Sequence, residues 1–134
     1  MKFENIKVDD EFVWNRVIDT EFVKQFAELT GDNNPIHLNE EFARNSIFGQ
    51  RIIHGLIVGT IFSKIIASDF PGPGSIYLHQ DLNFLKPIYH NSDLFFKLRV
   101  VSLKHEKRIV EIETLCIVNS VIAVNGTAVV KCLN

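Results

Sequence analysis

The sequence predicts an α+β domain in which an antiparallel β-sheet wraps around one long, buried α-helix. Two observations lead to this prediction. Residues 54–69 are apolar on almost every side of a helix, and everything after Ser75 consists of strand-like segments separated by turn residues. At 134 residues the chain fits one compact domain, 1–134, that can bury a sizeable core.

The first elements are a strand and a helix. Residues 11–18 alternate between two faces, which is typical of a strand. Asp19 or Thr20 then predicts the N-cap of a helix that continues to about residue 30, where Gly31 ends it. Spacings of four and three residues place three apolar side chains on one face of this helix: Phe22, Phe26 and Leu29. Residues 32–35 predict a turn-forming loop and 39–46 a second, short helix.

The central helix is predicted from His54 to about Asp69, and a helix with so little polar surface is a buried one. Small side chains recur along it at every fourth position: Gly55, Gly59, Ser63 and Ala67. Four residues turn the helix by about 400°, so these side chains form one slowly drifting stripe that another backbone can approach closely. The Pro and Gly residues at 71–74 end the helix.

Four strands are predicted after this helix, at 76–84, 93–104, 108–119 and 121–132. Residues 105–107 and 119–120 form the hairpin turns of an antiparallel meander. A sheet of this kind wrapped around one buried helix is the hotdog fold.

Composition and charge limit the range of possible functions. A formal net charge of -2 argues against nucleic acid as a partner, because phosphate-backbone binding needs concentrated Lys and Arg. Cys116 and Cys132 have neither CxxC nor zinc-ligand spacing, so we expect two small core side chains in a reducing compartment. The sequence shows neither a secretory signal nor an apolar stretch of 18 residues. We therefore expect a cytoplasmic protein without membrane contact.

Asp32 and His37 are the candidate catalytic residues. They lie five residues apart across a loop in which Pro35 keeps Asn34 out of helical dihedral angles. A carboxylate and an imidazole brought together there can share one water, and His is the usual proton-transfer group near neutral pH. By pattern alone, an Asp after Gly is more often a turn former and a His after a turn is more often a surface residue.

The run from Phe26 to His37, FAELTGDNNPIH, closely resembles the signature of the MaoC-like hydratases, in which a helix ends in a [Ser/Thr]-Gly-Asp-x-Asn-Pro-x-His loop. Further blocks match in the same order, namely IHGL at 53–56, GSIYL at 74–78 and DLNFLKPI at 81–88. The first block is highly specific, and together the blocks spread over most of the chain.

This resemblance implies a single hotdog domain that adds water to trans-2-enoyl thioesters with (R) specificity, or catalyses the reverse dehydration. It implies that Asp32 and His37 are the catalytic pair, supported by the Asn34-Pro35 loop, and that the Gly55 backbone N–H binds the thioester oxygen. Unsatisfied N–H groups at a helix N-terminus suit that role on physical grounds as well. Ser63 stands where the family has a hydroxyl that orients the catalytic Asp, although a small helix-packing residue is its other interpretation.

The resemblance also implies a homodimer or larger assembly, and an open sheet edge favours the same conclusion. No cofactor is expected, since coenzyme A or acyl carrier protein is part of the substrate, and no residue spacing indicates a metal site. Two alternatives remain: a hotdog thioesterase and a non-catalytic acyl-binding subunit. The absence of Asp and Glu from 56–68 counts against the first, and the presence of both Asp32 and His37 counts against the second.

The predictions for the remaining histidines are weaker. His79 either narrows the substrate tunnel or points to solvent. His54 is expected to shape the start of the central helix, and His90 and His105 are expected to be exposed.

Overall fold

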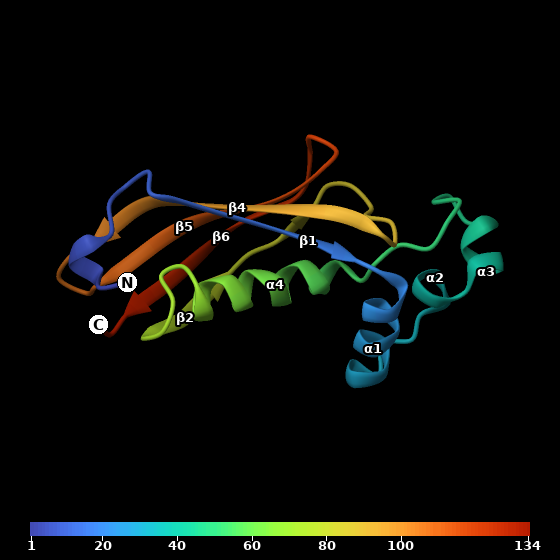
Figure 1. The fold of residues 1–134 in the computed structure, drawn as a ribbon, viewed down its shortest axis with the longest axis horizontal. Helices are drawn as coiled ribbons and strands as arrows, with labels where there is room; N and C mark the ends of the chain where they lie inside the picture. Colours follow the sequence, from blue (N-terminus) through green and yellow to red (C-terminus); the bar gives the residue numbers. More distant parts are fainter.

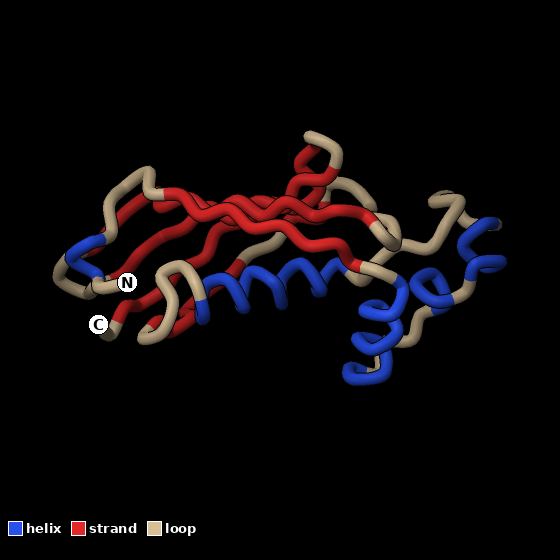
Figure 2. Tube along the Cα trace, in the orientation of Figure 1, coloured by secondary structure: helices blue, strands red, loops and turns tan.

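The computed structural model describes residues 1–134, and its sheet packs against one long helix, as the sequence predicts (Figures 1 and 2). In chain order the elements are η1 (Phe3–Asn5), β1 (Glu11–Ile18), α1 (Thr20–Thr30), α2 (Pro35–Leu38), α3 (Glu40–Arg44), α4 (Gly55–Ser68), β2 (Ser75–Gln80), β3 (Asn83–Phe84), β4 (Ser92–Lys104), β5 (Ile109–Val118) and β6 (Val121–Cys132). The strands run antiparallel in the order β1-β4-β5-β6-β2, and β3 pairs with β6.

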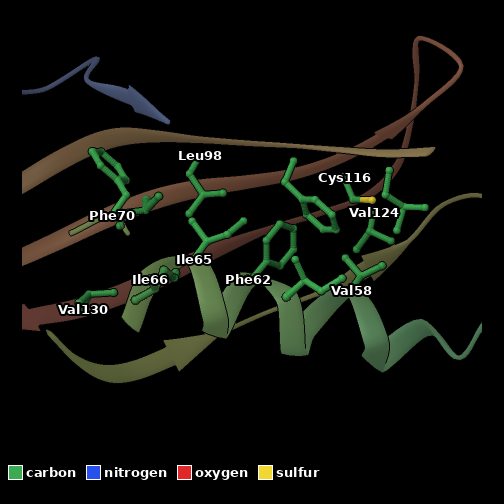
Figure 3. Close-up of a cluster of buried hydrophobic side chains, with 14 of the residues drawn as sticks. Val58, Phe62, Ile65, Ile66, Phe70, Leu98, Cys116, Val124 and Val130 are labelled. Carbon is green, nitrogen blue, oxygen red and sulfur yellow. The ribbon is translucent and has the colours of Figure 1, made fainter. Parts of the chain in front are cut away.

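The core lies between α4 and the concave side of the sheet, as Figure 3 shows for Val58, Phe62, Ile65 and their partners Leu98 and Val124. Twenty-five buried residues form this one cluster. Each fully buried aliphatic or aromatic side chain contributes about 1.5–3 kcal/mol. The cluster fixes α4 against the sheet and therefore fixes where the N-terminus of this helix lies. No helix in the structure is both long and apolar enough to cross a bilayer.

The opposite side of α4 is uncovered in the single chain, which corrects the prediction of a helix buried almost all round (Figure 1). The stripe of small residues lies on this side. No backbone packs along it: the side chains of Phe84 and Leu82 lie over Gly55 and Gly59, while Ser63 is exposed. The physical reason is that one sheet can cover only one face of a helix.

The strands after α4 differ from the predicted meander in two respects. The segment predicted as one strand at 76–84 is two, because the chain turns inward at Asp81 between β2 and β3. Asp81 N–H donates to the Thr127 carbonyl at 3.1 Å, and Thr127 N–H donates to the Asp81 carboxylate at 3.0 Å. In addition, β2 pairs with β6, not with the next long strand, because β4 already has β1 and β5 as neighbours.

Helix α1 has the predicted bounds, and it buries Val23 and Ala27. The Asp19 carboxylate accepts a hydrogen bond from Phe22 N–H at 2.8 Å, and Gly31 ends the helix in the left-handed conformation at φ 77°. Leu29 is 87% exposed, whereas Val23 and Ala27 are the buried residues. Spacing determines which residues share a face of the helix, but only packing determines which side meets the core.

Candidate active site

A cavity of about 470 Å³ lies beside the N-terminus of α4. Its polar side chains are Asp32, His37, His54 and Lys86, and Gly55 also lines it. Most of the wall is apolar and comes from loops, α4, the β3 segment and β6: Phe48, Ile52, Leu56, Phe84, Ile88 and Val124. An apolar cavity with a few convergent polar groups is the usual form of a small-molecule site.

The backbone of Asp32 is held from two sides. Thr30 Oγ1 donates to the Phe26 carbonyl at 2.7 Å and accepts from the Asp32 N–H at 3.2 Å. On the other side, His54 Nε2 donates to the Asp32 carbonyl oxygen at 2.8 Å. The Asp32 side chain itself is exposed, so its carboxylate is fixed at its base and free at its tip.

His37 is carried by α2, a short helix between the predicted loop at 32–35 and the predicted helix at 39–46. Asn34 caps this helix by accepting from Ile36 N–H at 3.2 Å, and Pro35 occupies its first turn, where the missing N–H costs nothing. These are the contacts by which Asn34 and Pro35 support the loop. They turn the His37 side chain toward the cavity.

The hydrogen bond of His37 identifies its basic atom. His37 Nδ1 lies 2.9 Å from the carbonyl oxygen of Ile52, and a carbonyl only accepts, so Nδ1 carries the proton of the neutral ring. The lone pair is then on Nε2. Burial lowers the pKa of His37 below its ordinary value of 6.5, and His54 lowers it further, while the Ile52 carbonyl and Asp32 raise it. His37 is therefore a neutral base at neutral pH.

The structure brings Asp32 and His37 together. One oxygen of the Asp32 carboxylate, one ring nitrogen of His37 and one of His54 all lie within 4.8 Å of one another. Two hydrogen bonds of about 2.8 Å meeting at a water oxygen span this distance. The pair can thus hold one water and move its proton.

His54 does more than shape the start of the central helix, because it contacts both Asp32 and His37. It is buried, with 2% of its surface exposed, and its ring stacks on the His37 ring at 3.8 Å between centroids and 25° between planes. Phe26 packs on it at 4.9 Å. The sequence signal was available, because His54 directly precedes the predicted helix N-terminus in a matching block, but no spacing rule connects it to residues 32 and 37.

Asp32, His37 and His54 form a cluster of metal-ligand types that the sequence spacing did not reveal. Its geometry is poorly suited to a metal ion. Imidazole lone pairs lie in the ring plane, so two nearly parallel rings 3.8 Å apart do not converge on one ion at the 2.0–2.1 Å that zinc requires. His54 Nε2 also uses its proton on the Asp32 carbonyl. The arrangement suits proton transfer.

Gly55 is the first residue of α4, where no earlier turn of the helix accepts its N–H, and no acceptor elsewhere in the chain bonds to it. A Cβ at this position would lie 2.7 Å from Cε1 of Phe84. Only glycine lets the Phe84 ring lie this close to the start of the helix.

Ser63 does not reach Asp32 within one chain. It lies eight residues after Gly55, about 12 Å further along α4. It is exposed and makes no hydrogen bond to Asp32.

Of the three other histidines, two are exposed and one, His90, is more buried than predicted. His79 points outward, 3.5 Å from the Asp81 carboxylate, and His105 is exposed as predicted. His90 corrects a prediction: it is half-buried, because its Nδ1 lies 3.1 Å from Thr20 Oγ1 and its Nε2 is enclosed. Burial lowers the pKa of His90.

The fold and the site define a hotdog domain in which a carboxylate and an imidazole line an apolar cavity. The chain belongs to the MaoC-like domain family, which matches residues 4–122. The resemblance seen in the sequence and the hotdog fold are both confirmed.

The relatives of this chain are hydratases and dehydratases by name. It is 37% identical over 129 residues to a 3-hydroxybutyryl-CoA dehydratase of Methylorubrum extorquens, covering 96% of this chain and 82% of that protein. It is 33% identical over 128 residues to an (R)-specific enoyl-CoA hydratase of Rhodospirillum rubrum, covering 96% and 89%. Among solved structures, the (R)-hydratase from A. caviae involved in PHA biosynthesis matches with a TM-score of 0.93 and 32% identity, covering 96% of this chain and 98% of that one.

Proposed function

We propose that this protein is an (R)-specific hydro-lyase that hydrates trans-2-enoyl thioesters to (3R)-hydroxyacyl thioesters, or catalyses the reverse dehydration. One observation carries the proposal: a carboxylate oxygen of Asp32 and a ring nitrogen of His37 lie within 4.8 Å of each other, and both residues line one apolar cavity. The named activities of the relatives support it.

The site residues have distinct roles in this reaction. The acyl chain lies in the apolar cavity and the thioester oxygen accepts from the Gly55 N–H, where the positive end of the α4 dipole stabilises enolate charge. Asp32 and His37 hold the water. Its oxygen adds to C3 while His37 Nε2 takes one proton, and C2 of the enolate then receives a proton from the pair. One water is consumed, and no electrons are exchanged with a cofactor.

The stereochemistry follows from the positions of these groups. Asp32 and His37 come from one short segment, so the water they hold meets one face of the double bond. The Gly55 N–H fixes which face this is. Delivery of both parts of the water from one side gives syn addition. The (R) sense is taken from the named relatives.

The wider setting is part of the proposal. Coenzyme A or acyl carrier protein is the carrier portion of the substrate, so no separate cofactor is required. Residues 1–134 act as one cytoplasmic domain and assemble as a homodimer or larger homo-oligomer. Two features support assembly: the outer edge of β2 is unpaired, and two large apolar side chains of this strand, Ile76 and Leu78, are exposed. The exposed Ser63 lies on the uncovered side of α4, so an orienting role for its hydroxyl requires a second subunit.

Incubation with crotonyl-CoA in heavy water tests the function. The expected product is (3R)-hydroxybutyryl-CoA with one deuteron added at C2. Thiol release that matches substrate loss would support the thioesterase alternative, and a (3S) product would contradict the stereochemical assignment. Repeating the assay over C4–C16 chains, on coenzyme A and on acyl carrier protein, identifies the substrate. Absence of reaction with all of them would support the acyl-binding alternative.

A further inference from the structure

His54 contacts both members of the candidate pair at once. Its Nε2 donates to the backbone carbonyl of Asp32 at 2.8 Å, and the same atom lies 4.0 Å from the Asp32 carboxylate. Its ring lies against the His37 ring, 3.8 Å between centroids. No other side chain in the structure has a hydrogen bond to Asp32 and a ring stacked on His37.

The proton of the neutral His54 ring can be assigned. The Asp32 carbonyl is an acceptor, so the proton lies on Nε2 and the lone pair on Nδ1. Nδ1 is buried and has no hydrogen-bond partner. Leaving a buried polar atom unpaired costs free energy. A Phe would also place an aromatic ring here without that cost, so packing alone does not account for an imidazole.

We propose that His54 is a positioning residue, which fixes Asp32 through the Nε2–H hydrogen bond and His37 through the stacked ring. The inference rests on the proposed function, in which these two residues hold the reacting water. His54 itself is enclosed behind the pair and is not assigned a proton-transfer step. Its hydrogen bond limits movement of the Asp32 backbone, and its stacked ring limits tilting of the His37 ring. The positions of these two residues determine where the water is held.

The positioning role of His54 can be followed through the pKa of His37, which its neighbours shift. The titratable groups that face His37 are Asp32 from the loop after α1, His54 from the start of α4, and His90 from the loop before β4. His54 lowers the pKa of His37, and Asp32 raises it. A His54→Phe change keeps the burial and removes the charge interaction, so the pKa of His37 rises.

Two variants separate the two contacts. His54→Phe keeps a stacking ring and loses the donor, whereas His54→Gln keeps an N–H near the position of Nε2 and loses the ring. We expect kcat/KM to fall about 10-fold to 100-fold in His54→Phe, mostly in kcat, with a smaller loss in His54→Gln. The acidic limb of the kcat/KM profile and the His37 NMR titration both move to higher pH in His54→Phe. His105→Phe, in an exposed turn, is the control and leaves both unchanged.

A folded His54→Phe with wild-type kcat/KM and an unmoved His37 titration overturns the proposal. If neither variant folds, nitrogen-15 shifts of the wild-type ring decide: the Nε2–H tautomer supports the role, and the Nδ1–H tautomer contradicts it. The tautomer of His54 and the titration of His37 can both be measured without substrate. A wild-type protein that does not hydrate enoyl thioesters would therefore refute the proposed function, while these NMR results would still report on His54.

Discussion

The Nδ1 atom of His37 lies 2.9 Å from the Ile52 carbonyl oxygen, and this contact leaves Nε2 as the basic atom of the ring. Ile52 precedes α4 by three residues, so the chain leading into this helix also determines the protonation pattern of the site. The acceptor is a backbone atom, which no side-chain substitution removes.

Removing either member of the pair should abolish most of the activity without unfolding the protein. Asp32→Asn and His37→Ala should each lower turnover at least about 100-fold, as expected for the loss of general acid–base catalysis. Both side chains lie outside the buried core cluster, so the circular dichroism spectrum and melting temperature should stay close to wild type. Near-normal turnover in either folded variant removes that residue from the mechanism.

The pH profile should reflect the lowered pKa of His37. The base must be unprotonated, so kcat/KM rises with pH through that pKa and is fully developed above it. Because burial lowers the pKa below 6.5, the acidic limb should have its midpoint below 6.5. An initial-rate series with unsaturating crotonyl-CoA measures it. A midpoint above 6.5 would contradict the geometry found for His37.

Gly55→Ala should impair catalysis more than stability. The added Cβ would lie 2.7 Å from the Phe84 ring, which is 55% exposed and can move away, changing the cavity wall beside the Gly55 N–H. We expect kcat/KM to fall at least about 10-fold. Gly59→Ala is the matched control, since Gly59 is on the same helix and does not line this cavity, and its Cβ would meet Leu82 at 3.1 Å and touch Leu56 at 4.0 Å. Equal losses in the two variants would remove Gly55 from the site.

Gly126→Ala should destabilise the fold. A Cβ there would overlap the carbonyl oxygen of Asp81, whose chain turns in over β6 at this point. Overpacking of this kind costs about 1–3 kcal/mol. Thermal or urea unfolding should show the loss, while Val121→Ala, at an exposed position of the same strand, should change little. A wild-type melting temperature would show that the 81–83 turn is not held in place as described.

The protein should sediment at about twice its 15.3 kDa chain mass or more. Leu78→Lys should weaken the assembly, because this exposed side chain on β2 lies beside Gly59 on the uncovered side of α4, whereas β1 is the opposite edge of the sheet. Val13→Lys on β1 is the matched control, with 51% exposure against 52% for Leu78. A fully active species of 15.3 kDa would contradict the proposed assembly.

Local chemistry was enough to predict most elements. Asp19 and Gly31 mark the ends of α1, and residues 119–120 both adopt the positive φ of a tight hairpin turn. The apolar residues of 54–69 predicted the central helix, since few other structures bury such a run. The break at Asp81 was not predicted, because residues 76–84 are strand-like throughout and only a contact with β6, distant in sequence, interrupts them.

Gly31, Asn34 and Pro35 act on their nearest neighbours, so the sequence alone specifies the bend that carries Asp32 and leads into the short helix with His37. The stacking of His54, seventeen residues after His37, on the His37 ring and the hydrogen bond from Nδ1 to the Ile52 carbonyl arise only in the folded chain. These contacts depend on where the core holds the N-terminus of α4. Spacing along the chain contains no information about that distance, so a buried His with two functional contacts was indistinguishable from a helix-start residue.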